Sequence, residues 1–162
     1  MAIKISVLGA SGRMGQLALS LIEQNSDLEL HSALSSHNSP AEAIGADLLV
    51  DLTKPDASVA IVDFAIQNNL KILVGTSGWS KEKLDALRDK MVGSRATVVV
   101  VPNFSIGSVL ATKFAAEAAK YFDSIEITET HHTKKLDAPS GTALFTAQEI
   151  SRVRNGRSAK PE

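Results

Sequence analysis

The chain has 162 residues, of which 44% are hydrophobic and 22% are charged, and its formal net charge is −1. This composition excludes an intrinsically disordered chain and a strongly basic nucleic-acid-binding protein. The chain contains no cysteine, which excludes disulfide bonds and thiolate metal sites. No apolar run has membrane-spanning length, and the first residues lack a signal-peptide pattern. We therefore expect a cytoplasmic protein that binds a small molecule, with no nucleic-acid or membrane partner.

The N-terminal segment has the pattern of a strand, a tight turn and a helix. An apolar run at residues 3–8 leads directly into the turn GASGRMG at residues 9–15. In this context the turn is a variant of the dinucleotide fingerprint, whose glycines let the backbone approach a pyrophosphate at the helix N-terminus. The alternative is a structural turn only. The helix is expected to pack on a sheet through Met14, Leu17, Ala18, Leu21 and Ile22.

A second strand is expected at residues 28–34, and the segment after it has no acidic residue. Dinucleotide-binding domains usually have an acid there for the adenosine ribose. Ser35, Ser36, His37 and nearby Arg13 are donors that suit a 2′-phosphate, so the sequence is compatible with NADPH as well as NADH. Alternatively, these residues belong to a solvent-facing loop.

Strands alternating with amphipathic helices continue to about residue 101. Further strands are expected at 48–52, 71–75 and 97–101, the last one fully buried, with helices starting after Pro55 and after Ser80. This alternation predicts an α/β domain of the Rossmann type, in which a parallel sheet has helices on both faces and binds ligands at the carboxyl ends of its strands.

Three loops then lie at that edge of the predicted sheet: residues 9–15, GTSGW at 75–79 and VPNFSIG at 101–107. Trp79 and Phe104 are the aromatic residues of the last two loops. Either ring is suited to contact a nicotinamide or an adenine, although aromatic residues in such places are more often packing residues.

The pattern changes after Pro102, and we place a domain boundary near Asn103. Residues 1–103 are expected to form the dinucleotide-binding domain, and residues 104–162 a partial α+β substrate domain. A helix from about 108 to 122 carries Leu110, Phe114, Ala118 and Tyr121 on one side. A half-buried strand should follow, because Ile125 and Ile127 alternate with polar residues.

That strand is expected to end at His131 and His132, beside Lys134 and Lys135. After Pro139, Ser140 is a natural N-cap for a helix that opens at Gly141. The free N–H groups of such a helix, together with the basic side chains, suit an anion. The alternatives are a solvated basic loop and a simple helix cap. A zinc site at the two histidines is disfavoured, because the only acidic residue near them as a third ligand is Asp137.

A dinucleotide domain followed by an anion pocket with proton donors implies hydride transfer to or from a small acidic molecule. Five segments together, GASGRMG, DLTKPD, GTSGW, VPNFSIG and HHTKKLDAPSGTA, make the chain similar to the 4-hydroxy-tetrahydrodipicolinate reductases, formerly called dihydrodipicolinate reductases, of diaminopimelate and lysine biosynthesis. The resemblance covers nearly all of the chain. It implies reduction of 4-hydroxy-tetrahydrodipicolinate, a small dicarboxylate, to tetrahydrodipicolinate with loss of water.

The resemblance also implies the site residues. His131 matches the catalytic histidine, and Lys135, rather than Lys134, matches the proton-donating lysine. His132, Gly141 and Thr142 match positions that hold the substrate's carboxylates, and no metal is implied. The cofactor of the family, NADH or NADPH, would bind Gly9, Ala10, Ser11, Gly12, Arg13, Met14, Gly75, Thr76, Ser77, Val101, Pro102, Asn103 and Phe104.

Family members continue for several more strands and a final helix, and they form homotetramers through those strands. Compared with them, the substrate domain looks truncated at Glu162, which would expose strand edges and apolar surface and disturb the tetramer. Two other functions remain open. One is a non-catalytic NAD(P)-binding module, and the other is a different NAD(P)-linked enzyme acting on an amino acid or a semialdehyde.

Overall fold

The computed structural model describes residues 1–131 and 138–154. The chain divides into two compact units, unit 1 (Met1–Pro102) and unit 2 (Asn103–Glu162). Among the described residues, no helix has the length and apolar character needed to cross a membrane.

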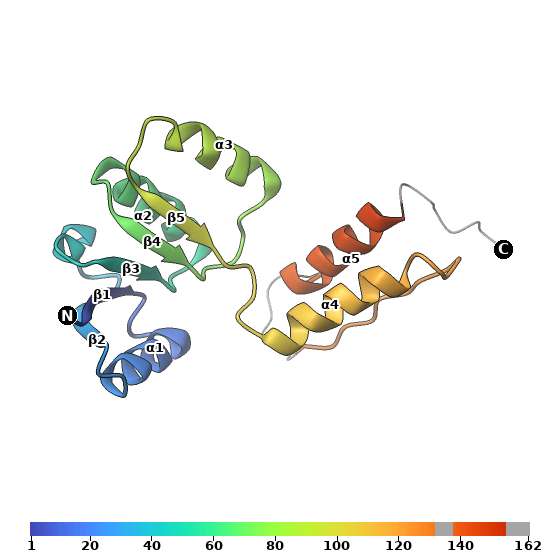
Figure 1. The fold of residues 1–162 in the computed structure, drawn as a ribbon, viewed down its shortest axis with the longest axis horizontal. Coiled ribbons are helices and arrows are strands. Elements are labelled where there is room, and N and C mark those ends of the chain that lie inside the picture. The colour runs from blue at the N-terminus through green and yellow to red at the C-terminus, as the bar shows by residue number, and fades with distance from the viewer. Residues whose placement is uncertain (132–137, 155–162) are drawn as a thin grey trace. The chain divides into compact units, whose positions relative to one another are not determined.

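Unit 1 is built on a five-stranded sheet (Figure 1). Its strands are β1 (Ile3–Leu8), β2 (Leu28–Leu34), β3 (Leu48–Asp51), β4 (Lys71–Val74) and β5 (Thr97–Val100). Their order is β2-β1-β3-β4-β5, and all neighbouring strands are parallel. The predicted parallel α/β sheet is confirmed. Because the strand order reverses beside β1, the carboxyl ends of β1 and β3 form the switch point at which such sheets bind ligands.

Helices cover both faces of this sheet, as the alternation predicted. They are α1 (Arg13–Glu23), α2 (Pro55–Gln67) and α3 (Lys81–Met91), with a short 3-10 helix, η1 (Pro40–Ala43). Ile5 and Val7 of β1 pack with Ile22 of α1. The α2 and α3 helices share a separate core with strand residues such as Leu49 and Ile72. The two cores arise because successive strand residues point to opposite faces of the sheet.

The α1 helix packs through only part of the predicted face, because Ile22 is buried in the core and Ala18 is partly buried against it. Its buried residues are Gly15 and Ile22, whereas three side chains of the predicted face are exposed, namely Met14, Leu17 and Leu21. A Cβ at position 15 would overlap the carbonyl oxygen of Gly9, so the helix touches the turn most closely at its glycine. The close backbone approach turns the helix toward Gly15, so that Ala18 and Ile22 stay in contact with the core while the other three predicted side chains do not.

The prediction that the fifth strand is fully buried is wrong. β5 lies at the edge of the sheet, and Val99 is 49% exposed. Val98 and Val100 are partly buried against the core shared by α2 and α3. A short apolar run has the same sequence pattern at the edge of a sheet as at its centre, which explains the error.

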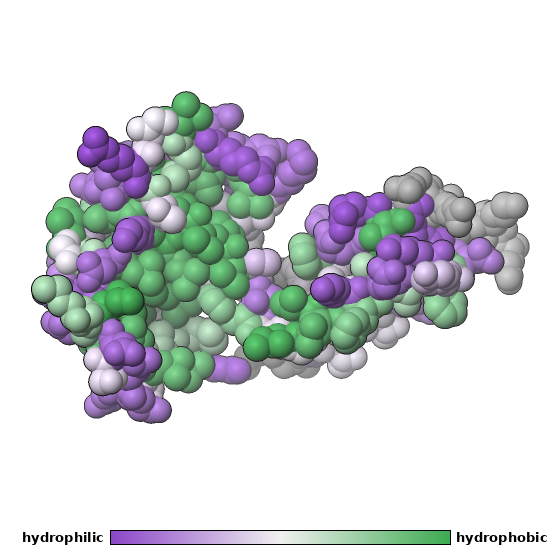
Figure 2. Space-filling view, in the orientation of Figure 1, coloured by the Kyte–Doolittle hydropathy of each residue, from purple (hydrophilic) through white to green (hydrophobic). Residues whose placement is uncertain are grey.

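The described part of unit 2 contains two helices, α4 (Ile106–Ala118) and α5 (Gly141–Val153), which lie side by side (Figure 1). Thr112 and Ala116 are the buried residues of α4, and the Thr112 hydroxyl is 2.8 Å from the hydroxyl of Thr146 on α5. The large side chains of the predicted apolar side of α4, Leu110 and Phe114, are exposed. Figure 2 accordingly shows apolar surface along α4.

The half-buried strand predicted around Ile125 and Ile127 is wrong. Residues 124–131 have no regular secondary structure, and both isoleucines are exposed. Alternation describes only which way side chains point, whereas a strand also needs a neighbour, and the described part of unit 2 provides none. This segment is instead tied at its start by Arg154, whose guanidinium donates to the carbonyl oxygens of Phe122 and Asp123 at 2.6 and 2.7 Å.

Candidate cofactor and substrate sites

The glycine turn after β1 is held between two strand ends. The N–H groups of Gly9 and Ala10 both donate to the carbonyl oxygen of Leu34 at 2.9 Å. Gly9 has a φ of +84°, and a Cβ there would lie 2.5 Å from the carbonyl oxygen of Leu52. Only glycine combines this φ with such a close approach. The turn is therefore packed against the ends of β2 and β3.

The N-terminus of α1 has no capping side chain. Its N-cap is Gly12, and the first turn of the helix contains no acidic residue. Of the other helices, α2 also has no side-chain cap, whereas α3, α4 and α5 are capped by the hydroxyls of Ser80, Ser105 and Ser140. The first N–H groups of a helix need acceptors, and an anion can supply them. The α1 end at Arg13 and Met14 thus has the chemistry of a pyrophosphate cradle.

The loop after β4 lies at the same edge of the sheet. The N–H of Gly75 donates to the Asp51 carbonyl oxygen at 2.9 Å. Thr76 is only 6% exposed, and its hydroxyl donates to the Asp51 carboxylate at 3.1 Å, whereas Ser77 is exposed.

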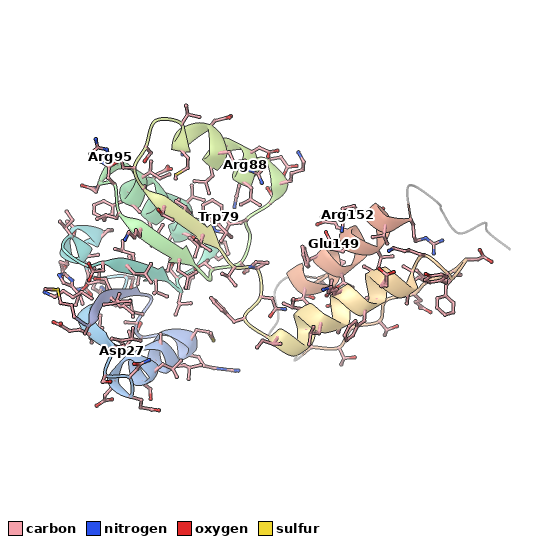
Figure 3. All side chains as sticks on the ribbon, in the orientation of Figure 1. Asp27, Trp79, Arg88, Arg95, Glu149 and Arg152 are labelled. Carbon is pink, nitrogen blue, oxygen red and sulfur yellow. The ribbon has the colours of Figure 1, made fainter. Side chains whose placement is uncertain are left out.

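Trp79, labelled in Figure 3, packs against the core shared by α2 and α3. Its indole N–H donates to the Ser58 hydroxyl at 3.2 Å. Of the two alternatives for this residue, the structure supports packing.

The third predicted cofactor segment crosses the boundary between the units. Val101 belongs to the sheet edge of unit 1, because its N–H donates to the Val74 carbonyl oxygen at 2.8 Å. Pro102 is the last residue of unit 1, so Asn103 and Phe104 belong to unit 2. The Asn103 amide there accepts from the Ser105 N–H and donates to the Ser108 hydroxyl, both at 2.8 Å. Within unit 1, the structure gathers residues 9–14, 75–77 and 101 at one edge.

The turn after β2 has an acidic neighbour that the sequence reasoning missed. The N–H and hydroxyl of Ser35 both donate to the Asn38 side-chain oxygen at 3.0 Å. The Asn38 amide donates to Glu42 at 3.2 Å, and the Ser39 N–H donates to the same carboxylate at 2.9 Å. A negative charge therefore lies near this turn, although the residues directly after β2 include no acid. Ser39 and Glu42 form a capping box. The spacing of three residues between a serine and a glutamate is the sequence feature that could have placed Glu42 at this turn.

In unit 2, Glu129 connects the predicted catalytic histidine to the start of α5. One of its carboxylate oxygens accepts from the Ser140 N–H at 2.8 Å, and the other accepts from the Ser140 hydroxyl. The second oxygen also lies 3.5 Å from Nδ1 of His131. Glu129 was not predicted as a site residue. The sequence feature that could have identified it is its position two residues before His131, since alternate residues of an extended segment point to the same side.

The predicted start of α5 is confirmed. Ser140 is the N-cap, its hydroxyl accepts from the Ala143 N–H at 3.1 Å, and the helix begins at Gly141. Within the described chain, the N–H groups of Gly141 and Thr142 donate no hydrogen bond. A Cβ on Gly141 would meet no protein atom within 4 Å, so packing does not require glycine there. These two amides can therefore bind an anion.

Three predicted residues, His132, Lys134 and Lys135, lie outside the described residues. An open groove of about 560 Å³ in unit 2 is lined mainly by apolar residues, including Ile127, Pro139 and Leu144, with Glu129 at its border. An apolar lining does not suit carboxylates, so we do not assign the groove as the anion site. Among residues 1–131 and 138–154, no group of three His, Asp or Glu side chains is placed to hold a metal ion.

The sheet, its switch point and the glycine turn define an α/β protein of the Rossmann type. Residues 3–104 match the family "Dihydrodipicolinate reductase, N-terminus", and residues 107–162 match "Dihydrodipicolinate reductase, C-terminus". The chain therefore belongs to the dihydrodipicolinate reductase family, which confirms the resemblance found in the sequence.

Individual relatives agree with this assignment. The chain is 45% identical, over 97% of its length, to the 4-hydroxy-tetrahydrodipicolinate reductase of Clavibacter michiganensis, and it covers 57% of that relative. It is 44% identical to the Corynebacterium urealyticum reductase, over 94% of its own length and 62% of that relative. A solved structure, "Dipicolinate bound Dihydrodipicolinate reductase from Paenisporosarcina sp. TG-14", is 34% identical with a TM-score of 0.74, over 95% of this chain and 67% of that one. The chain thus spans about three fifths of the length of the two curated relatives.

Proposed function

We propose that the protein catalyses the NAD(P)H-dependent reduction of 4-hydroxy-tetrahydrodipicolinate to tetrahydrodipicolinate, with loss of water. One observation carries the proposal beyond family membership. The α5 helix begins with two amides that have no acceptor among the described residues, and His131 is linked to that helix end through Glu129. A helix end of this kind beside a histidine suits a substrate carboxylate.

The residues at the sheet edge of unit 1 fit the cofactor. The uncapped N–H groups at Arg13 and Met14 would hold the pyrophosphate, and Gly9 lets the turn that precedes them pack closely on the carbonyl oxygen of Leu52. When bound, NADH or NADPH supplies the hydride. Ser36, His37 and Glu42 offer both donors and an acceptor near the turn after β2, so we propose that both nucleotides are used.

In unit 2, the N–H groups of Gly141 and Thr142 would bind one substrate carboxylate, with His132 assisting. His131 would lie beside the reacting ring, oriented by Glu129. Lys135 would donate the proton that accompanies reduction. The Paenisporosarcina relative was solved with dipicolinate bound, which supports a planar dicarboxylate as the ligand class. The homotetramer of the family and the cytoplasmic location stay predictions.

Steady-state oxidation of NADH and NADPH with freshly generated substrate tests the proposal. We expect turnover that pyridine-2,6-dicarboxylate inhibits. Nucleotide binding without dicarboxylate binding or turnover would overturn the proposal in favour of a non-catalytic module. Turnover of an amino acid or a semialdehyde that pyridine-2,6-dicarboxylate does not inhibit would favour a different NAD(P)-linked enzyme.

The two adjacent lysines provide a matched test of the proton donor. We expect Lys135→Ala to lower kcat by about a hundredfold or more, the usual contribution of a positioned acid, while the Kd for nucleotide stays within about twofold. Lys134→Ala is the control and should keep kcat near the wild-type value. Equal losses in the two variants would show that the assignment of Lys135 is wrong.

A further inference from the structure

A buried carboxylate lies beneath the loop that follows β4. Asp51 is the last residue of β3, and it is 0% exposed. Within the described chain, no lysine, arginine or histidine forms an ion pair with it. A buried carboxylate without a cation must be held by hydrogen bonds, because burial removes the water that would otherwise solvate it.

Those hydrogen bonds come from three separate segments. Thr53 donates to one carboxylate oxygen of Asp51 through its N–H at 3.0 Å and its hydroxyl at 2.6 Å. Thr76 donates to the same oxygen at 3.1 Å, and the Ser58 hydroxyl donates to the other oxygen. Ser58 in turn accepts from the indole N–H of Trp79 at 3.2 Å. One carboxylate therefore fixes both ends of the loop at residues 75–79, directly through Thr76 and through Ser58 at Trp79.

The same strand end also touches the glycine turn. The carbonyl oxygen of Leu52, next to Asp51, occupies the space where a Cβ of Gly9 would be. The backbone carbonyl of Asp51 accepts from the Gly75 N–H at 2.9 Å. The end of β3 thus contacts both loops that are proposed to bind the nucleotide in unit 1, the glycine turn and the loop at residues 75–77. The carboxylate of Asp51 connects β3 to the second of these loops.

The side chain of Thr76 is turned away from solvent. The residue is 6% exposed, and its hydroxyl lies within hydrogen-bonding distance of both the carboxylate and the carbonyl oxygen of Asp51. A hydroxyl directed into the core in this way has no access to a ligand at the sheet edge. What the loop presents to a ligand is its backbone and the exposed Ser77.

We propose that Asp51 is a positioning residue, which holds the backbone of residues 75–77 in its nucleotide-binding conformation through the hydroxyl of Thr76. The role of Thr76 in nucleotide binding is therefore exerted on Asp51 and not on the nucleotide. The part of this inference that concerns nucleotide binding rests on the proposed function. Its structural part, the attachment of the loop to Asp51, is independent of that function.

Two conservative changes at Thr76 separate positioning from simple packing. Thr76→Val keeps the shape of the side chain and removes the hydroxyl, whereas Thr76→Ser keeps the hydroxyl and removes a methyl group. Trp79 is the only tryptophan, so acrylamide quenching of its emission reports the order of this loop in the absence of nucleotide. Thr112→Val, which removes a buried hydroxyl in unit 2, is the control.

We expect Thr76→Val to increase the quenching of Trp79 and to raise the Kd for NADH and NADPH about tenfold, as the loss of a hydrogen bond to a charged group predicts. Thr76→Ser should stay within about twofold of the wild type in both measurements, and Thr112→Val should leave the quenching unchanged. Thr76→Ala, which also removes the hydroxyl, replaces Thr76→Val should that variant not fold.

Unchanged quenching and unchanged Kd in Thr76→Val would overturn the inference, and so would equal losses in Thr76→Val and Thr76→Ser. If the wild-type protein binds neither nucleotide, the proposed function fails, and the nucleotide part of the inference fails with it. The quenching of Trp79 then still decides whether Thr76 attaches the loop to Asp51.

Discussion

Glu129 contacts both groups that the proposed substrate site requires. Its carboxylate accepts from the N–H and hydroxyl of Ser140 and lies beside His131. Its side chain is 27% exposed, so solvent screens its charge only in part. An acceptor with two oxygens can satisfy the helix start and the imidazole together. A neutral amide at this position has one acceptor oxygen and one donor nitrogen, and it cannot do so.

We therefore expect Glu129→Gln to weaken inhibition by pyridine-2,6-dicarboxylate about tenfold, because both the helix start and the histidine lose their fixed orientation. Removing hydrogen bonds to a charged group should also lower the free energy of unfolding by about 1 kcal/mol. Inhibitor titration and urea denaturation measure the two effects. Glu126→Gln, in the same segment and exposed, is the control. Inhibition that is unchanged in Glu129→Gln would contradict the orienting role.

The residues that the sequence predicted well are those whose function depends on near neighbours. Ser140 caps the helix three residues ahead of Ala143, so the spacing alone revealed it. Asp51 and Glu129 were missed, because their partners Thr76 and Ser140 lie 25 and 11 residues away in the chain. Such contacts are set by the tertiary fold, so local spacing does not reveal them, although the place of Glu129 two residues before His131 did indicate its contact with that histidine.

At the scale of elements, α1 is positioned by the absence of a side chain at Gly15. A Cβ there would overlap the carbonyl oxygen of Gly9 and crowd the backbone of Ala10. Replacing glycine by alanine inside a helix normally stabilises it by about 1 kcal/mol. Here the helix would have to move away from the turn whose N–H groups are proposed to bind pyrophosphate. The steric cost, about 1–3 kcal/mol for an overpacked site, exceeds the gain in propensity.

We expect Gly15→Ala to lower the free energy of unfolding by up to about 2 kcal/mol, the overpacking cost less the gain in propensity. The Kd for nucleotide should rise in parallel, because the helix start is displaced. Gly107→Ala in α4 is the matched control. A Cβ there would be 4.0 Å from the Ser105 hydroxyl, and the protein should keep or slightly gain stability. Chemical denaturation and nucleotide titration test both variants, and a stabilised Gly15→Ala would contradict the close approach.

The positions of most strands and helices could be predicted because each has a hydrophobic period of its own. The hydrophobic period of a segment does not show which other element the segment packs against. The α1 helix has apolar residues beyond the face that it buries, β5 has the composition of a central strand, and residues 125–128 alternate without a strand beside them. In each case the error concerned packing against another element, which depends on the assembled fold.

At the scale of the whole molecule, the two units have very different cores. Among the described residues, the buried apolar side chains of unit 2 are Ala116, Ala119 and Ile150, whereas unit 1 buries strand residues from β1, β3 and β4. Several large side chains of unit 2 are exposed, such as Phe114 at 64%. A small core with little buried apolar area supplies little of the hydrophobic stabilisation that opposes chain entropy.

We therefore expect amide hydrogen exchange in α4 and α5 to be at least tenfold faster than in β1, β3 and β4, since local opening free energies follow buried contacts. Pyridine-2,6-dicarboxylate should slow exchange at the start of α5, and nucleotide should slow it in unit 1. Mass spectrometry of exchanged peptides measures these rates. Equal protection in the two units would show that the small core of unit 2 does not limit its local stability.

Trp79, packed behind the loop at residues 75–78, also gives the protein an optical property. Reduced nicotinamide absorbs at the wavelengths at which tryptophan emits. A dinucleotide held at the carboxyl edge of this sheet would therefore accept excitation energy from the single indole. Because such transfer falls steeply with separation, its efficiency measures how near the bound nicotinamide lies to β4, and it does so without any added label.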